Sequence, residues 1–259
     1  ALNAVHSIMS DKIFGASGNH IVIEEFLEGP EVSVLSFTDG KTLAPMISSK
    51  DHKRALDNDE GLNTGGMGTI APNPYYTPEM AERCMKEIFL PTVEAMKAEG
   101  RTFKGCLYFG LMITKDGPKV IEYNCRFGDP ETQVVLPLLK TDLLTIFEAV
   151  HDERLAEIPV EFSDESAACV IMASGGYPQK YQTGYEISGL DSMGQAQGVT
   201  VYHAGTKLEN GKFLTSGGRV LGVTATGKDR EDALQKSYAA VAKISFQDAH
   251  YRKDIGKIR

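Results

Sequence analysis

The chain has 259 residues, 42% of them hydrophobic and 24% charged, which is enough to bury a core as one large domain or two modest ones. Its 27 basic and 35 acidic residues give a net charge of -8. That balance argues against a nucleic-acid or anionic-membrane surface, so we expect neither partner. Small anionic substrates would need a local basic site.

The cysteine spacing indicates reduced thiols, and the hydropathy indicates no membrane span. The four cysteines are far apart and form no CxxC pair, so reduced thiols in a cytoplasmic protein are favoured over disulfides or zinc. No apolar run approaches the roughly 20 residues of a membrane span, and no signal peptide is visible. The chain opens without an initiator Met inside an apparent helix at residues 1–9, so we expect a fragment.

The first predicted unit is a hairpin. Residues 21–27 form a short apolar run that ends in acids, a turn follows at 28–30, and residues 32–37 return as a strand. Exposed backbone groups beside an apolar side chain can hydrogen-bond a flat heterocycle. Glu31, at the edge of this stretch, could accept hydrogen bonds from ribose hydroxyls. On this stretch alone, a plain surface hairpin with solubilising acids is favoured.

Residues 48–68 are polar and glycine-rich, and we predict a long loop without periodicity. It concentrates Lys50, Lys53 and Arg54 in an acidic protein, which favours a function. The glycines at 65, 66 and 68 would let backbone N–H groups converge on an anion. The spacing of a P-loop is absent, and a flexible surface loop is the alternative.

A helix is expected to start at Thr77 and to end at Gly100, with Pro91 kinking or breaking it. Residues 106–113 and 119–124 then form a hairpin that delivers Glu122 and Asn124 to a strand end. Because alternate side chains share a face, Glu122 and Asn124 should point to the face that carries a functional site. Ile121 and Tyr123 should point to the opposite face, toward the core. A carboxylate beside an amide oxygen suits a hard cation such as Mg2+.

The remainder predicts two further helices and then a different kind of structure. Helices are expected at 132–140 and 142–151, and an irregular tether at 152–166. The expected strands after it are 167–172, 199–208, 212–214 and 219–226, with a type I′ turn at Asn210-Gly211 and one helix at 229–244. We therefore predict two domains, 1–160 and 161–259.

Four stretches in order resemble the ATP-grasp ligases, and among them the phosphoribosylamine-glycine ligase (glycinamide ribonucleotide synthetase) family. They are EEFLEGPE at 24–31, DHKR at 51–54, NTGGMG at 63–68 and EYNCRFGDPE at 122–131. The runs VYHAGTK at 201–207 and GGRVLGV at 217–223 are similar to the closing domain of that family. The resemblance implies an α+β fold: the C-terminal part of an ATP-grasp domain, with an antiparallel sheet and helices, followed by a small, mainly β domain.

The resemblance also implies a reaction and its residues. The family joins glycine to 5-phosphoribosylamine with ATP, through glycyl phosphate, in purine biosynthesis. The Glu25 carbonyl and Leu27 N–H, with Glu24, would bind adenine, and Glu31 would bind the ribose. Glu122 and Asn124 would hold Mg2+ or Mn2+. Arg126 is expected to stabilise the acyl phosphate; its alternative role is an ion pair with Asp129 or Glu131. The expected substrate or phosphate loop comprises Lys53, Arg54, Asn63, Thr64, Gly65, Gly66 and Asp129.

Two departures from the family pattern limit what the resemblance implies. Several relatives carry another acid on the neighbouring strand, where this chain has Phe109-Gly110-Leu111, so phosphate and water should complete the metal shell. The family's N-terminal half should precede Ala1, and we expect the isolated piece to be inactive or nearly so. The alternatives are another ATP-grasp carboxylate-amine ligase or carboxylase, and a non-catalytic ATP-grasp binding module.

Overall fold

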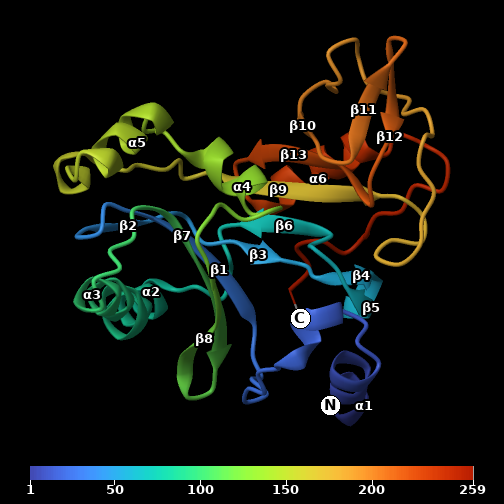
Figure 1. Cartoon of the computed structure of the whole chain (residues 1–259). Coiled ribbons are helices and arrows are strands. Elements are labelled where there is room, and N and C mark those ends of the chain that lie inside the picture. The colour runs from blue at the N-terminus through green and yellow to red at the C-terminus, as the bar shows by residue number, and fades with distance from the viewer. Residues whose placement is uncertain (259) are drawn as a thin grey trace.

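A computed structural model describes residues 1–258 of the chain. Its first sheet, called sheet A, has four antiparallel strands in the order β2-β1-β7-β8 (Figure 1). These strands are β1 (Glu31–Thr38), β2 (Leu43–Pro45), β7 (Gly105–Thr114) and β8 (Gly117–Asn124). The strands expected at 32–37 and 106–113 and the β7–β8 hairpin are confirmed.

One face of sheet A is covered by helices α2 (Pro78–Cys84) and α3 (Leu90–Ala98). Alternation along the strands places Val34 and Phe109 on this face, against Phe89 of the helical segment. The hydroxyl of Thr77 accepts from the Met80 N–H at 3.2 Å, which confirms the predicted N-cap. The predicted break at Pro91 is replaced by a π-helical turn at Met85–Phe89, which joins α2 directly to α3.

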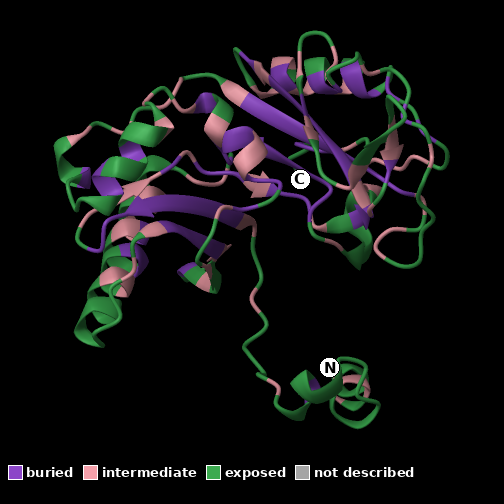
Figure 2. Ribbon diagram, turned by 45° about the horizontal axis from the view of Figure 1, so that its top comes forward, coloured by how far each residue is buried: buried purple, intermediate pink, exposed green. Residues whose placement is uncertain are grey.

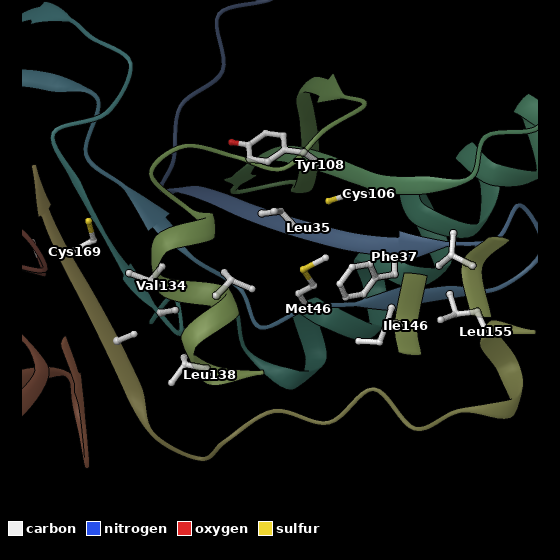
Figure 3. Packing of buried hydrophobic residues seen from close by; sticks show 14 of the residues in the cluster. Leu35, Phe37, Met46, Cys106, Tyr108, Val134, Leu138, Ile146, Leu155 and Cys169 are labelled. Carbon is white, nitrogen blue, oxygen red and sulfur yellow. The ribbon is translucent and has the colours of Figure 1, made fainter. Parts of the chain in front are cut away.

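The other face of sheet A packs on α4 (Thr132–Val135) and α5 (Leu143–His151). Figure 3 shows Leu35 and Phe37 of β1 beside Val134, Leu138 and Ile146. The helix expected at 132–140 is shorter than predicted, because it tightens into a 3-10 turn at Leu136–Leu138. The Asp142 carboxylate caps α5 by accepting from the Thr145 N–H at 2.8 Å.

The second sheet, called sheet B, has five strands in the order β10-β13-β9-β6-β3. Its strands are β3 (Lys50–Asp51), β6 (Gly68–Ala71), β9 (Ser166–Ala173), β10 (Thr200–His203) and β13 (Arg219–Gly227). Helix α6 (Arg230–Val241) covers one face of β9 and β13 (Figure 1). Two strands from the first half of the chain thus complete a sheet of the second half. The division at residue 160 stays a prediction.

Two small ribbons extend from this framework. One pairs β4 (Arg54–Leu56) with β5 (Glu60–Asn63), and the other pairs β11 (Thr206–Glu209) with β12 (Lys212–Thr215). Both Asn210 and Gly211 have positive φ, as the predicted I′ turn requires. The single strand expected at 199–208 is interrupted between β10 and β11, so that it serves sheet B and the ribbon separately.

The N-terminal arm lies apart from the rest of the molecule. Residues 1–19 comprise α1 (Leu2–Val5), a π turn at His6–Ser10 and a 3-10 turn at Gly15–Asn19. An extended stretch joins this arm to β1 (Figure 2). No helix among residues 1–258 is both long and apolar enough to cross a membrane.

The expected strand at residues 21–27 is wrong. This stretch is extended but pairs with no strand of the described chain, so the predicted hairpin with β1 does not form. Val22, Ile23 and Phe26 are 85%, 81% and 88% exposed. β-Propensity alone does not make a strand, because a strand needs a partner edge, and β1 is already paired on both sides by β2 and β7.

Candidate active site

A cavity of about 430 Å³ opens on the face of sheet A away from α2 and α3. Strand register brings its polar lining together: Gly110 of β7 lies opposite both Ser33 of β1 and Glu122 of β8, and Tyr108 lies opposite Asn124. A Cβ at Gly110 would lie 3.0 Å from the Glu122 Cγ. The glycine therefore leaves the space that the Glu122 side chain occupies.

The predicted alternation along β8 holds for Glu122 and Asn124 but is wrong for Ile121. All three residues line the cavity, whereas Val120 and Tyr123 line a groove on the opposite face, against α3. The cause is a β-bulge: Gly110 pairs with Glu122 and the next residue, Leu111, pairs with Val120, which leaves Ile121 as the extra residue. A bulge resets the alternation of side chains along a strand.

The glycine-rich segment that forms the cavity's second wall is more ordered than predicted. Instead of one loop, residues 50–71 contain β3, β4, β5 and β6. The hydroxyl of Thr64 donates to the Lys53 carbonyl at 2.8 Å and accepts from the Gly66 N–H at 2.9 Å. Gly66 has a φ of +110°, and a Cβ there would lie 2.6 Å from an Asp51 oxygen, so only glycine fits.

Buried charges stand behind Lys53. The Lys53 ammonium lies 2.8 Å from Oδ2 of Asp51, whose Oδ1 is buried without a hydrogen bond. Burial raises the pKa of Asp51 to about 7; Lys53 lowers it and Glu131 adds to the rise. Burial opposes the charge on Lys53, yet the Asp51 carboxylate raises the Lys53 pKa above its ordinary value. Two acids therefore compete for one cation at the base of the cavity.

Glu131 is the second of these acids and is 4% exposed. Its Oε1 accepts from the hydroxyls of Ser33 and Tyr108, each at 3.2 Å. Burial, and then the Glu131 charge, raise the pKa of Tyr108, so this phenol stays a donor. Chain separations of 98 and 23 residues within this network explain why the sequence did not show it.

The expected alternative role of Arg126 is not found. The Arg126 guanidinium donates to the Phe127 carbonyl at 2.8 Å and lines the cavity. Asp129 instead pairs with Arg219, whose Nη1 lies 3.2 Å from its Oδ1. Glu131 is engaged by hydroxyls, as described above. The exposed guanidinium of Arg126 therefore remains directed to the cavity.

Two further cavities, of about 370 and 420 Å³, extend the site along residues 24–29. The nearer one shares Glu31 and Ile121 with the first cavity, so together they form one elongated cleft. Glu24, Glu25 and Leu27 line this end with Lys119 of β8. No hydrogen bond within residues 1–258 uses the Glu25 carbonyl or the Leu27 N–H.

Most of the expected site residues are brought together in the first cavity. Those that line it are Glu31, Lys53, Asn63, Thr64, Gly65, Glu122, Asn124, Arg126 and Asp129. Arg54 does not line it, because its guanidinium turns away to donate to the Gly61 carbonyl at 2.9 Å. Gly66 lies behind the lining, against Asp51 and Pro130. Sequence reasoning missed Ser33, Tyr108, Asp51 and Arg219, which meet through the fold alone.

Comparison with known protein families identifies both halves of this arrangement. The family model described as phosphoribosylglycinamide synthetase, ATP-grasp (A) domain, matches residues 1–132, and the model of the C domain matches residues 167–258. The chain belongs to the phosphoribosylglycinamide synthetase family. The predicted resemblance and the α+β fold class are thereby confirmed, and the elongated cleft lies mainly in the part matched by the ATP-grasp model.

Individual members of this family cover the whole chain. A phosphoribosylamine-glycine ligase of Clostridium acetobutylicum is 49% identical over 99% of the chain, and the trifunctional purine biosynthetic protein adenosine-3 of Gallus gallus is 51% identical over 99%. The chain spans 61% and 26% of these two relatives. The crystal structure of a Thermotoga maritima phosphoribosylamine-glycine ligase matches 99% of the chain with a TM-score of 0.82 at 33% identity, over 64% of its own length.

Proposed function

We propose that this chain forms one wall of the active site of an ATP-dependent ligase that joins glycine to 5-phosphoribosylamine. The products are glycinamide ribonucleotide, ADP and phosphate. In the first step a glycine carboxylate oxygen attacks the γ-phosphorus of ATP and ADP leaves. In the second step the amine nitrogen of the sugar attacks the carbonyl carbon of glycyl phosphate and inorganic phosphate leaves.

The observation that carries this proposal is the single cleft, whose two ends differ in chemistry. One end offers backbone groups and apolar surface at residues 24–27, and the other offers Lys53, Arg126 and the glycine turn at 64–66. Glu122 and Asn124 lie on the cavity floor with the second set. A nucleotide lying along the cleft would place its phosphates beside Arg126 and the oxygen pair of Glu122 and Asn124, short of Lys53 and the glycine turn.

At the apolar end, the Glu25 carbonyl and the Leu27 N–H are proposed to hydrogen-bond the adenine edge. Both groups lack a partner within the described chain, and Phe26 between them is 88% exposed. Glu31 is proposed to accept from the ribose hydroxyls, since it is shared by the adenine-end cavity and the phosphate-end cavity. Glu24 contributes a wall of the nearer cavity.

Glu122 and Asn124 fit a hard divalent cation, Mg2+ or Mn2+. A carboxylate and an amide oxygen on adjacent same-face positions supply the oxygen donors that such ions prefer. Within residues 1–258 no group of three His, Cys, Asp or Glu side chains is arranged to hold a metal ion. Phosphate and water oxygens would therefore complete the shell, and the bound ion would neutralise charge on the transferring phosphoryl group.

Arg126 is the proposed anion clamp, because its fork can bind two oxygens of the acyl phosphate. Lys53, with the backbone of residues 63–66 and Asp129 beside it, is proposed to receive the sugar substrate, whose phosphate needs a cation. Positioning and charge neutralisation supply most of the catalysis in phosphoryl transfer, so no general base is required of these residues in the first step.

The test is ADP formation by the full-length protein in which this chain occurs, with glycine and 5-phosphoribosylamine both required. A panel of other small acids, including bicarbonate and formate, separates this ligase from other ATP-grasp enzymes. Glu122→Gln should lower turnover at least a hundredfold and raise the Mg2+ requirement. Glu94→Gln, on the exposed surface of α3, is the matched control. Equal turnover without glycine would contradict the proposal.

A further inference from the structure

The C-terminal half of the chain reaches the cavity through Arg219, the first residue of β13. Its Nη1 donates to the Gly65 carbonyl at 2.7 Å and to the Asp129 carbonyl at 3.1 Å, and lies 3.2 Å from the Asp129 carboxylate. Gly65 and Asp129 both line the cavity, whereas Arg219 lies behind them. One guanidinium nitrogen thus joins two separate segments of the lining.

Tyr177 holds the other backbone polar group of Gly65. Its hydroxyl accepts from the Gly65 N–H at 3.0 Å, so both the N–H and the carbonyl of Gly65 are bonded to residues of the C-terminal half. The Tyr177 ring rests on Gly218, where a Cβ would lie only 2.4 Å from it. Gly218, the residue before Arg219, therefore leaves room for the ring of Tyr177. Tyr177 and Arg219 both bind Gly65.

These contacts hold Gly65, whose N–H and carbonyl bond to the C-terminal half and not to the turn itself. A Cβ at Gly65 would lie 3.0 Å from the Arg219 Cζ, so any other residue there would push the guanidinium away by a few tenths of an ångström. Gly65 is exposed and loses more backbone entropy on ordering than any other residue type would. Bonds from outside the turn are what hold its carbonyl and N–H in one orientation.

The contacts lie at one end of the cleft only. The cavity at residues 24–27 shares Glu31 and Ile121 with the first cavity, but none of Thr64, Gly65 and Asp129. The proposed adenine site is therefore remote from Arg219 and Tyr177. A change at either residue should act on what binds beside Lys53 and Gly65, and not on the nucleotide.

We propose that Arg219 and Tyr177 are positioning residues. They fix the backbone at the end of the cavity that binds the phosphorylated amine substrate, and they take no direct part in ATP binding. This assignment rests on the function proposed above for the same cavity. It gives the C-terminal half a defined role: its two side chains orient the Gly65 peptide and Asp129 so that an anionic sugar can be received beside Lys53.

The kinetic test uses Tyr177→Phe and Arg219→Lys in the full-length protein. Each should raise KM for 5-phosphoribosylamine about tenfold while KM for ATP stays within twofold and kcat within threefold. Tyr181→Phe removes a hydroxyl from the ring next to Tyr177, and Arg154→Lys changes a surface arginine; both should leave all three constants unchanged. An equal rise in KM for ATP, or no change in either KM, would overturn the assignment.

A second test needs no substrate and separates this inference from the proposed function. Amide hydrogen exchange at Gly65 should quicken about tenfold in Tyr177→Phe and stay unchanged in Tyr181→Phe. Unchanged exchange at Gly65 would refute the positioning role, whatever the enzyme assay shows. If exchange quickens but the wild type forms no ADP with 5-phosphoribosylamine, the positioning holds and the proposed function fails.

Discussion

Arg252 offers the sharpest test of how the C-terminal tail supports the site. It is 1% exposed, and its guanidinium makes a two-pronged contact with Asp254 at 2.8 and 2.9 Å. Its Nη1 also lies 2.9 Å from an Asp59 oxygen and donates to the Arg54 carbonyl at 3.1 Å. Although burial opposes ionisation of Asp254, the hydrogen bonds from Arg252 help lower its pKa to about 2.

Arg252→Met keeps an apolar stem of similar length and removes the charge. Loss of one partner from a buried pair costs about 3–5 kcal/mol, because the other charge is left unpaired. The side chain of Asp254 is 10% exposed and pays this penalty, whereas that of Asp59 is 53% exposed and can rehydrate. We therefore expect a loss near the lower bound, about 3 kcal/mol.

Urea unfolding of the chain measures this loss. With a slope of about 3 kcal/mol/M, the midpoint should fall by about 1 M in Arg252→Met. Adding Asp254→Asn should restore part of the loss, since the unpaired charge disappears. Arg154→Met, whose surface partner Asp152 is about half exposed, should barely move the midpoint. A loss below about 1 kcal/mol in Arg252→Met would refute the reasoning.

Three other predictions follow from the site and its frame. Because burial raises the pKa of Asp51 from 3.8 to about 7, its contribution to stability is full below about pH 4 and is lost as pH rises to about 7; Asp51→Asn should therefore flatten the fall of the unfolding midpoint between about pH 4 and 7, and an unchanged slope would contradict this. Gly110→Ala should displace Glu122 and so raise the Mg2+ concentration for half-maximal activity about tenfold, while the circular dichroism spectrum without ATP stays that of the wild type. Thr77→Ala should cost about 1 kcal/mol in urea unfolding by removing the α2 cap, and a neutral result would show that packing alone fixes this helix start.

The sequence predicted those helices and strands that depend on interactions between residues close together in the chain. Apolar runs located β1, β7, β8 and β13, and capping residues located the starts of α2 and α5. The Glu122 and Asn124 pair was predicted because both lie on one strand, two residues apart. Segments whose structure depends on a partner were misassigned, as residues 21–27 and 50–71 show.

The missed parts of the site share one cause, which is long separation in the chain. The bulge at Ile121 arises from the register with β7, which no pattern within β8 reveals. Asp51 and Glu131 are 80 residues apart, and Arg219 is 154 residues from Gly65. Charges that far apart in sequence become neighbours only when two sheets meet, so residue types alone could not assign them a role.

The same segment, residues 51–66, is held from two directions by the C-terminal half. Arg252 and its neighbours secure the β4–β5 ribbon: the Asn58 N–H donates to Asp254 at 2.9 Å, and the Lys253 N–H donates to Asp57 at 2.8 Å. Arg219 and Tyr177 secure the Gly65 peptide beyond that ribbon. A polar, glycine-rich segment can thus present Lys53 and Thr64 in fixed positions although Ala55 is its one buried apolar side chain, because its order is imposed by distant partners.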